Sequence, residues 1–277
     1  MKCATTTLHD QLARQPGLFL STPKEPNFFG DDAQWALGLA HYGRLFAAAP
    51  VGALCGESST HYTKQREFPE ACARMAASVP RVRLVYLMKH PVERLVSHYI
   101  HEWSQRVIDS PLEQAVERHP ELIEYSCYAQ QLAPYFDAFG PEAVLPVFVP
   151  WMQRHPQQVL EAVARHIGLN TPVHWQAEVE RSNVSEQRLR LAPWMRWAVE
   201  HPVLQTARRR LVPRAWRDRV KDRLRMKERP ALSPALRRQL EARFDQDLAQ
   251  LGHRLGWTLD CAGFNETVAR QPAAWRY

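Results

Sequence analysis

The sequence lacks the cysteine patterns that would build a disulfide framework. Its 277 residues contain five cysteines, an odd number, and no two of them form a C-x-x-C pair. Scattered single cysteines are typical of reduced thiols, so we expect a cytoplasmic protein. The five are Cys3, Cys55, Cys72, Cys127 and Cys261.

Long apolar runs are missing as well. No stretch of about 18 apolar residues occurs, so the sequence predicts no membrane-spanning helix. The first residues do not show a basic segment followed by an apolar one, and we therefore expect no secretory leader. Internal repeats are absent. With 45% hydrophobic and 23% charged residues, the chain is predicted to form one domain over 1–277 with a substantial core.

Two short signatures of enzymes are also absent. The sequence has no Gly-Lys pair and hence no G-x-x-x-x-G-K-[ST] loop, which argues against an ordinary ATPase or GTPase. His98 and His101 are three residues apart and precede Glu102, but this is not the H-E-x-x-H pattern of a zinc site. No further ligands accompany them, so we expect no metal.

Positive charge is concentrated in one segment. Residues 206–230 contain eleven Arg or Lys and three acidic residues, a balance of +8, whereas the whole chain carries +7. One interpretation is a solvated basic helical arm. The alternatives are a surface for an anionic acceptor such as a polysaccharide, or peripheral contact with an anionic membrane, because Trp216 and other apolar residues lie among the charges. No recognised motif supports binding to nucleic acid, which we do not expect.

Strand and helix patterns alternate along the chain. This alternation predicts an α/β fold with a central, mostly parallel sheet and flanking helices. Pro146 makes the strand over 143–149 an edge or bulged strand. The C-terminal packing helix over 233–256 opens with Ser233 and Pro234 as N-cap and first residue. The other elements that we expect are helices over 7–14, from 92 onward, 124–139 and 156–167, and strands over 18–20, 51–55 and 82–88.

The most informative stretch is Lys2–Leu8, in which a lysine and small or hydroxyl residues precede a helix. A helix N-terminus offers unpaired N–H groups and a positive dipole, both of which favour an anion. The Thr hydroxyls and the Lys2 ammonium add to that preference. The stretch predicts a phosphate-gripping loop, although a capped surface helix would give the same pattern.

Three later segments accompany this loop, and all four occur in a characteristic order. The segments are Lys24–Phe29, Gly56–Tyr62 and Lys89–Tyr99. In that order they resemble the sulfotransferases that use 3′-phosphoadenosine 5′-phosphosulfate (PAPS), in the bacterial and heparan-sulfate-like branch. The resemblance implies a three-layer, P-loop-like fold and covers nearly the whole chain.

The resemblance also implies roles for individual residues. The 5′-phosphosulfate would be held by Lys2, which also acts in catalysis, and by the rest of the loop: Cys3, Ala4, Thr5, Thr6 and Thr7. Lys89 and Ser97 would hold the 3′-phosphate. Glu25 matches the proposed catalytic base, with His61 as the rival, and no metal is implied. The acceptor would be a carbohydrate or a lipid-linked sugar.

Three departures from the family pattern accompany the match. Ala4 takes the usual place of Gly, and Lys89 replaces an Arg whose bidentate fork it cannot offer. The family also has a short apolar strand directly before the loop lysine, where this chain has only Met1. We therefore expect either that the true start lies upstream of Met1 or that this is a form truncated before its first strand. Two alternatives to an active sulfotransferase stay open, namely a catalytically weak or dead anion-binding protein and a P-loop kinase-like phosphotransferase.

Overall fold

The computed structural model describes residues 2–177 and 229–276. Within this part, four strands form two parallel pairs. β1 (Leu18–Leu20) pairs with β2 (Leu54–Gly56), and β3 (Leu84–Met88) pairs with β4 (Val144–Phe148). The parallel pairing agrees with the prediction, whereas the single central sheet does not form among these residues.

The two strand pairs face each other across a cavity of about 860 Å³. One wall contains Leu18 and Leu20 of β1 and all three residues of β2. The opposite wall contains Leu84–Leu87 of β3. In the described chain no strand lies between β2 and β3. The backbones of β2 and β3 are not hydrogen-bonded to each other across this gap. The predicted single sheet is therefore divided into two strand pairs.

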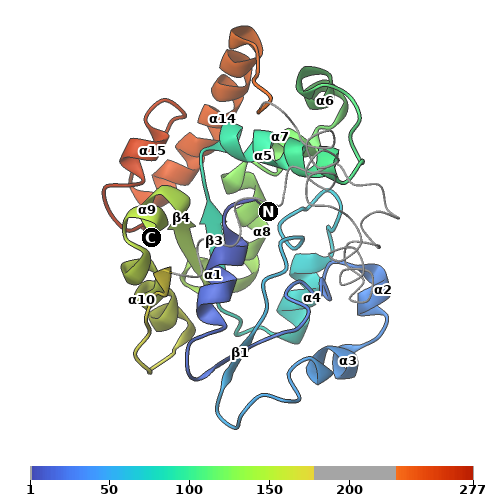
Figure 1. Ribbon diagram of the computed structural model, residues 1–277, viewed down its shortest axis with the longest axis vertical. Helices are drawn as coiled ribbons and strands as arrows, with labels where there is room; N and C mark the ends of the chain where they lie inside the picture. Colours follow the sequence, from blue (N-terminus) through green and yellow to red (C-terminus); the bar gives the residue numbers. More distant parts are fainter. Residues whose placement is uncertain (1, 178–228, 277) are drawn as a thin grey trace, which may run out of the picture.

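Helices surround the strands on both sides. In Figure 1, β3 and β4 lie near the centre, with α14 and α15 on one side and α2, α3 and α4 on the opposite side. Their bounds are α1 (Thr5–Leu12), α2 (Asp32–Trp35), α3 (Leu39–Arg44), α4 (Ala71–Ser78), α5 (Pro91–Ser104), α6 (Leu112–Arg118), α7 (Glu121–Glu124), α8 (Tyr128–Phe139), η1 (Pro141–Ala143), α9 (Val149–Arg154), α10 (Pro156–Ile167), α14 (Pro234–Leu255) and α15 (Phe264–Thr267). None of these described helices is long and apolar enough to span a membrane.

Helix α14 begins and ends within one residue of the range predicted for the C-terminal helix. The Ser233 hydroxyl accepts a hydrogen bond from the Leu236 backbone N–H, and Gly256 ends the helix in the left-handed conformation. Both are standard helix-capping devices. One face of the helix is fully buried against the core, where it contacts α8 and α5, through Leu240, Phe244, Leu248, Leu251 and Leu255.

The predicted helix over 124–139 is divided into α7 and α8. The separation lies at Tyr125–Cys127, where the carboxylate of Asp247 on α14 caps the new helix. Its two oxygens accept hydrogen bonds from the backbone N–H groups of Ala129 and Gln130, both at 3.0 Å. A cap supplied from a helix more than 100 residues away cannot be read from local periodicity.

Two other predictions need comment. The strand expected over 51–55 begins only at Leu54, because Gly52 takes a positive φ of 81° in a turn. The basic segment 206–230 lies outside the described residues except for its last two positions, so its helical form stays a prediction.

Candidate functional site

The loop before α1 has the geometry of an anion site. Lys2 and Ala4 both adopt a positive φ, 64° and 58°. This turn brings the loop directly onto the first residue of α1, Thr5, and the N-cap residue Ala4 has no side chain that could cap that helix. Uncapped first-turn N–H groups are free to bind an anion. The left-handed conformation of Ala4 explains why glycine suits this position better than alanine.

Cys3 has a different position from its neighbours. Its side chain is 2% exposed and belongs to the hydrophobic core, so only its backbone can face a ligand. Thr5, Thr6 and Thr7 are half-buried in the first turn of α1. Of the residues predicted to hold the 5′-phosphosulfate, Lys2 and Ala4 line one pocket, Thr5 lines the larger cavity instead, and Cys3, Thr6 and Thr7 line neither.

Two lysines from separate motifs line one pocket of about 530 Å³. Lys2 precedes α1, and Lys89 follows β3 directly. Burial lowers the pKa of Lys2, and the charge of Lys89 lowers it further. Burial also lowers the pKa of Lys89. Two partly desolvated, mutually repelling cations favour an anion between them.

The two residues predicted to hold the 3′-phosphate, Lys89 and Ser97, are in contact. Lys89 Nζ donates a hydrogen bond to Ser97 Oγ at 2.7 Å, so Lys89, which precedes α5, reaches a residue in the middle of that helix. Tyr128 holds the Lys89 backbone from the other side, since its hydroxyl donates to the Lys89 carbonyl at 2.5 Å. Arg94, by contrast, is 3% exposed and bonds Ser126 at 3.2 Å, which gives it a structural role.

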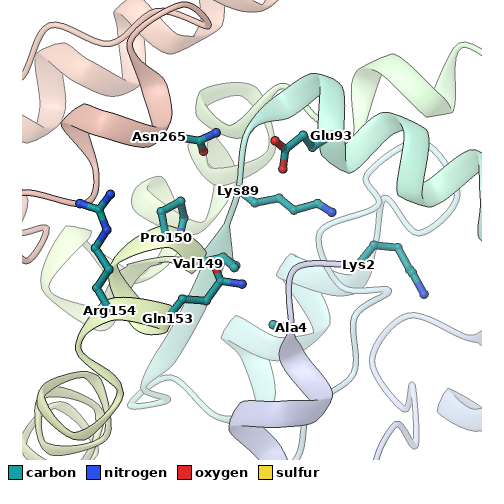
Figure 2. A pocket seen from close by; sticks show the side chains of 9 residues that line it. All are labelled: Lys2, Ala4, Lys89, Glu93, Val149, Pro150, Gln153, Arg154 and Asn265. Carbon is teal, nitrogen blue, oxygen red and sulfur yellow. The ribbon is translucent and has the colours of Figure 1, made fainter. Parts of the chain in front are cut away.

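Three polar or charged residues outside the sequence motifs also line this pocket. Gln153 and Arg154 lie at the end of α9, and Asn265 lies on α15. Figure 2 shows Arg154 and Gln153 on one side of the pocket and Lys2 on the other, with Lys89 between them. The available signal was that α9 directly follows β4, as the junction that carries Lys89 follows β3. The lining of the pocket thus contains a third cation, Arg154, and one carboxylate, Glu93.

Glu25 is held as a carboxylate in the neighbouring loop. Lys24 Nζ donates to its Oε1 at 2.8 Å, and the hydroxyl of Thr60 donates to its Oε2 at 2.7 Å. Burial raises the pKa of Glu25, but these hydrogen bonds outweigh burial, so its pKa is lower than usual. The charge of Glu25 also acts on Lys2 and raises its pKa. The predicted base therefore lies in the electrostatic field of the predicted phosphate lysine.

His61 occupies the same region as Glu25. Its ring stacks on Phe68 at a centroid distance of 5.0 Å. Burial, followed by the charge of Lys64, lowers its pKa, so the imidazole is neutral at pH 7. Both candidate bases are thus in their proton-accepting form, and the structure leaves the choice between them open.

The histidines of α5 do not form a metal centre. His98 Nε2 lies 3.3 Å from Glu102 Oε1, one turn further along the helix. Burial lowers the pKa of His98 to about 4. Within residues 2–177 and 229–276, no three His, Cys, Asp or Glu side chains are placed to share a metal ion.

Comparisons with known proteins give a match of fold. No protein-family model matches the sequence, and no curated protein matches it. Among solved structures, a sulfotransferase from Alicyclobacillus acidocaldarius superimposes with a TM-score of 0.63, and the match covers 93% of each chain at 20% identity. This chain therefore shares the α/β fold of that sulfotransferase.

Proposed function

We propose that the protein transfers a sulfuryl group from PAPS to a hydroxyl or amine of an acceptor. The observation that carries this proposal is that Lys2 and Lys89 line one pocket, with Ser97 hydrogen-bonded to Lys89 and the charge of Glu25 acting on Lys2. Three of the four segments that resemble the sulfotransferases supply these residues. The shared fold supports the same interpretation.

In the proposed reaction the S–O bond to the 5′-phosphate breaks and a bond from sulfur to the acceptor oxygen or nitrogen forms. The leaving nucleotide gains negative charge, and stabilising it is the main catalytic task. Lys2 and the N–H groups at the start of α1 face that charge. Lys89 and Ser97 hold the 3′-phosphate, which keeps the 5′ group oriented.

Glu25 takes the proton that the acceptor loses. Its lowered pKa keeps it ionised at neutral pH. A general base needs a distance of about 2.6–3.2 Å to the nucleophile, so the acceptor must bind within that reach of the Glu25 carboxylate. We prefer Glu25 to His61 because its loop context matches the branch of the family that uses a glutamate.

The acceptor is proposed to be a carbohydrate or a lipid-linked sugar. The basis is the charge of residues 206–230, which suits an anionic glycan or the anionic surface of a membrane. We propose a cytoplasmic enzyme that contacts such a surface peripherally.

Transfer of labelled sulfate from PAPS to a panel of sugar acceptors tests the proposal. We expect the wild-type protein to transfer, and Lys2→Ala and Glu25→Gln to lose about 100-fold or more in kcat. Arg237→Gln, at an exposed position on α14, serves as the matched control and should keep full activity. Full transfer by Glu25→Gln would show that the base is wrong. No transfer together with tight nucleotide binding would favour the inactive anion-binding protein.

A further inference from the structure

Three consecutive residues of the segment Gly56–Tyr62 bind three positions of the loop that carries Glu25. The Ser58 N–H donates to the Lys24 carbonyl at 3.0 Å. The Ser59 hydroxyl accepts from the Asn27 N–H at 2.9 Å. The Thr60 hydroxyl and N–H donate to Glu25 Oε2 at 2.7 and 3.3 Å. The two loops are thus joined on both sides of Glu25 and at its carboxylate.

Glu57 fixes the middle connection. Its Oε2 accepts hydrogen bonds from both the N–H and the hydroxyl of Ser59. Its Oε1 accepts from the hydroxyls of Tyr42 and Tyr62. Four donors therefore converge on one partly buried carboxyl group. Burial raises the pKa of Glu57, and the hydrogen bonds from Ser59, Tyr62 and Tyr42 act against that rise. Hydrogen bonds to the ionised form are among the strong ones.

The two tyrosines connect this carboxylate to the rest of the fold. Tyr42 stacks on Phe28 at 4.7 Å between ring centroids, and Tyr62 packs edge-on against Phe29 at 5.7 Å. Phe28 and Phe29 are 1% and 2% exposed and belong to the same loop as Glu25. Glu57 is therefore tied both to the hydrogen-bonded connection and to the packed aromatic side of that loop.

We propose that Glu57 is a positioning residue, which holds Ser59 and Thr60 so that Thr60 orients the Glu25 carboxylate. This inference rests on the proposed function, in which Glu25 accepts the proton of the acceptor. Glu57 lines the large cavity and is absent from the phosphate pocket, so it acts through Thr60 and not on the donor.

The connection has a consequence for the proton affinity of Glu25. Hydrogen bonds from Lys24 and Thr60 lower the pKa of Glu25, against the effect of burial. The titratable groups whose pKa the charge of Glu25 raises are Lys2, His9, His61 and His101, and these also face it. If Thr60 is released while these groups stay in place, the pKa of Glu25 rises toward its ordinary value.

The test replaces Glu57 by alanine and follows transfer as a function of pH. We expect kcat of Glu57→Ala to fall by about threefold between pH 5.5 and 8, where Glu25 stays ionised in both proteins, and by about tenfold below about pH 4, while KM for PAPS stays within about twofold. The acid limb of the profile moves to higher pH because more of Glu25 is protonated. Ser59→Ala, which removes the middle connection and keeps the Glu57 carboxylate, should reproduce the shift.

Tyr42→Phe is the matched control. It removes one donor to Glu57 Oε1 and leaves the bonds between Oε2 and Ser59 intact. Its pH profile should therefore coincide with that of the wild type, even if the protein loses some stability. A shift in Tyr42→Phe as large as in Ser59→Ala would overturn the proposal, because general loosening would then explain both.

A titration by carbon-13 NMR of the Glu25 carboxyl separates this inference from the proposed function. It needs no acceptor and no turnover. We expect the midpoint to rise by about half a pH unit or more in Glu57→Ala and Ser59→Ala relative to the wild type. Unchanged midpoints in the folded Ser59→Ala protein would refute the positioning role of Glu57, whatever the activity assay shows. A shifted midpoint in a protein that transfers no sulfate would support the positioning role and refute the function.

Discussion

Ala4 is one of four non-glycine residues in the described chain that adopt a positive φ. Its φ of 58° places it in the left-handed region, which costs an L-residue about 1 kcal/mol relative to glycine. The turn persists because it delivers Lys2 to the phosphate pocket and the chain to the start of α1. Alanine in place of the family's glycine therefore destabilises this turn.

We expect Ala4→Gly to raise the free energy of unfolding by about 0.5–1 kcal/mol, since the relief of strain exceeds the added entropy of the unfolded chain. Urea unfolding measures it. Ala36→Gly, at a right-handed helix terminus, is the control and should destabilise or leave the protein unchanged. A loss of stability in Ala4→Gly would contradict the strain that we assign to this turn.

The lysines of the pocket predict a pH dependence of nucleotide binding. Because burial lowers both pKa values below 10.5, Lys2 and Lys89 lose their protons at a lower pH than ordinary lysines. The affinity for adenosine 3′,5′-bisphosphate should therefore fall about tenfold between pH 7.5 and 10. Calorimetric titration across this range gives the slope.

The control for this prediction is the double variant Lys2→Arg and Lys89→Arg. Arginine stays charged throughout the range, so its affinity should be nearly independent of pH. Equal slopes in the wild type and the double variant would show that other groups cause the dependence.

At the scale of elements, the gap between β2 and β3 is the main feature. Leu20, Leu54 and Leu87 line it, and neither strand has a partner on that side in the described chain. Lys2 and Lys89 line the same pocket at the carboxyl end of β3. A strand that runs parallel to β3 through the gap would therefore end where Lys2 begins.

We expect that fusing five β-branched apolar residues ahead of Lys2 raises both the melting temperature and the nucleotide affinity. The added strand would pair with both edges and bury apolar surface, and a gain of about 2 kcal/mol corresponds to roughly 4–8 °C for a chain of this size. Differential scanning calorimetry measures the first effect. An extension of equal length made of Gly and Ser is the control, and equal melting temperature and affinity for the two extensions would refute the prediction.

Elements whose signals are local could be predicted from the sequence. The helix over 156–167 has its predicted bounds because Pro156 and Gly168 mark its two ends. Helix α4 and the division between α7 and α8 were not predicted. The Asp247 cap on α8 comes from a distant element, which no window of neighbouring residues contains.

The same distinction holds for the site. Lys89 and Ser97 belong to one strand-to-helix junction, so their contact follows from their spacing. Gln153, Arg154 and Asn265 reach the pocket only because α9 and α15 pack beside it. Their contribution depends on tertiary packing, which the alternation of strands and helices does not specify.

In the molecule as a whole, two regions carry the two kinds of group that the proposed reaction needs, cations and a carboxylate. One region gathers the cations Lys2, Lys89 and Arg154 around a pocket. The other region holds Glu25 as a carboxylate through Lys24 and Thr60. The charge of Glu25 acts on Lys2, which links the two regions. Under the proposed function, a donor bound in the first region presents its reacting group to the second.

The most direct test of this account is the calorimetric affinity for adenosine 3′,5′-bisphosphate compared with that for ATP and magnesium. The account predicts that the bisphosphate binds at least about tenfold more tightly, and that Lys89→Ala removes about tenfold of that affinity while it leaves binding of the 5′-monophosphate nearly unchanged. Tighter binding of ATP with magnesium would contradict the account and favour a phosphotransferase.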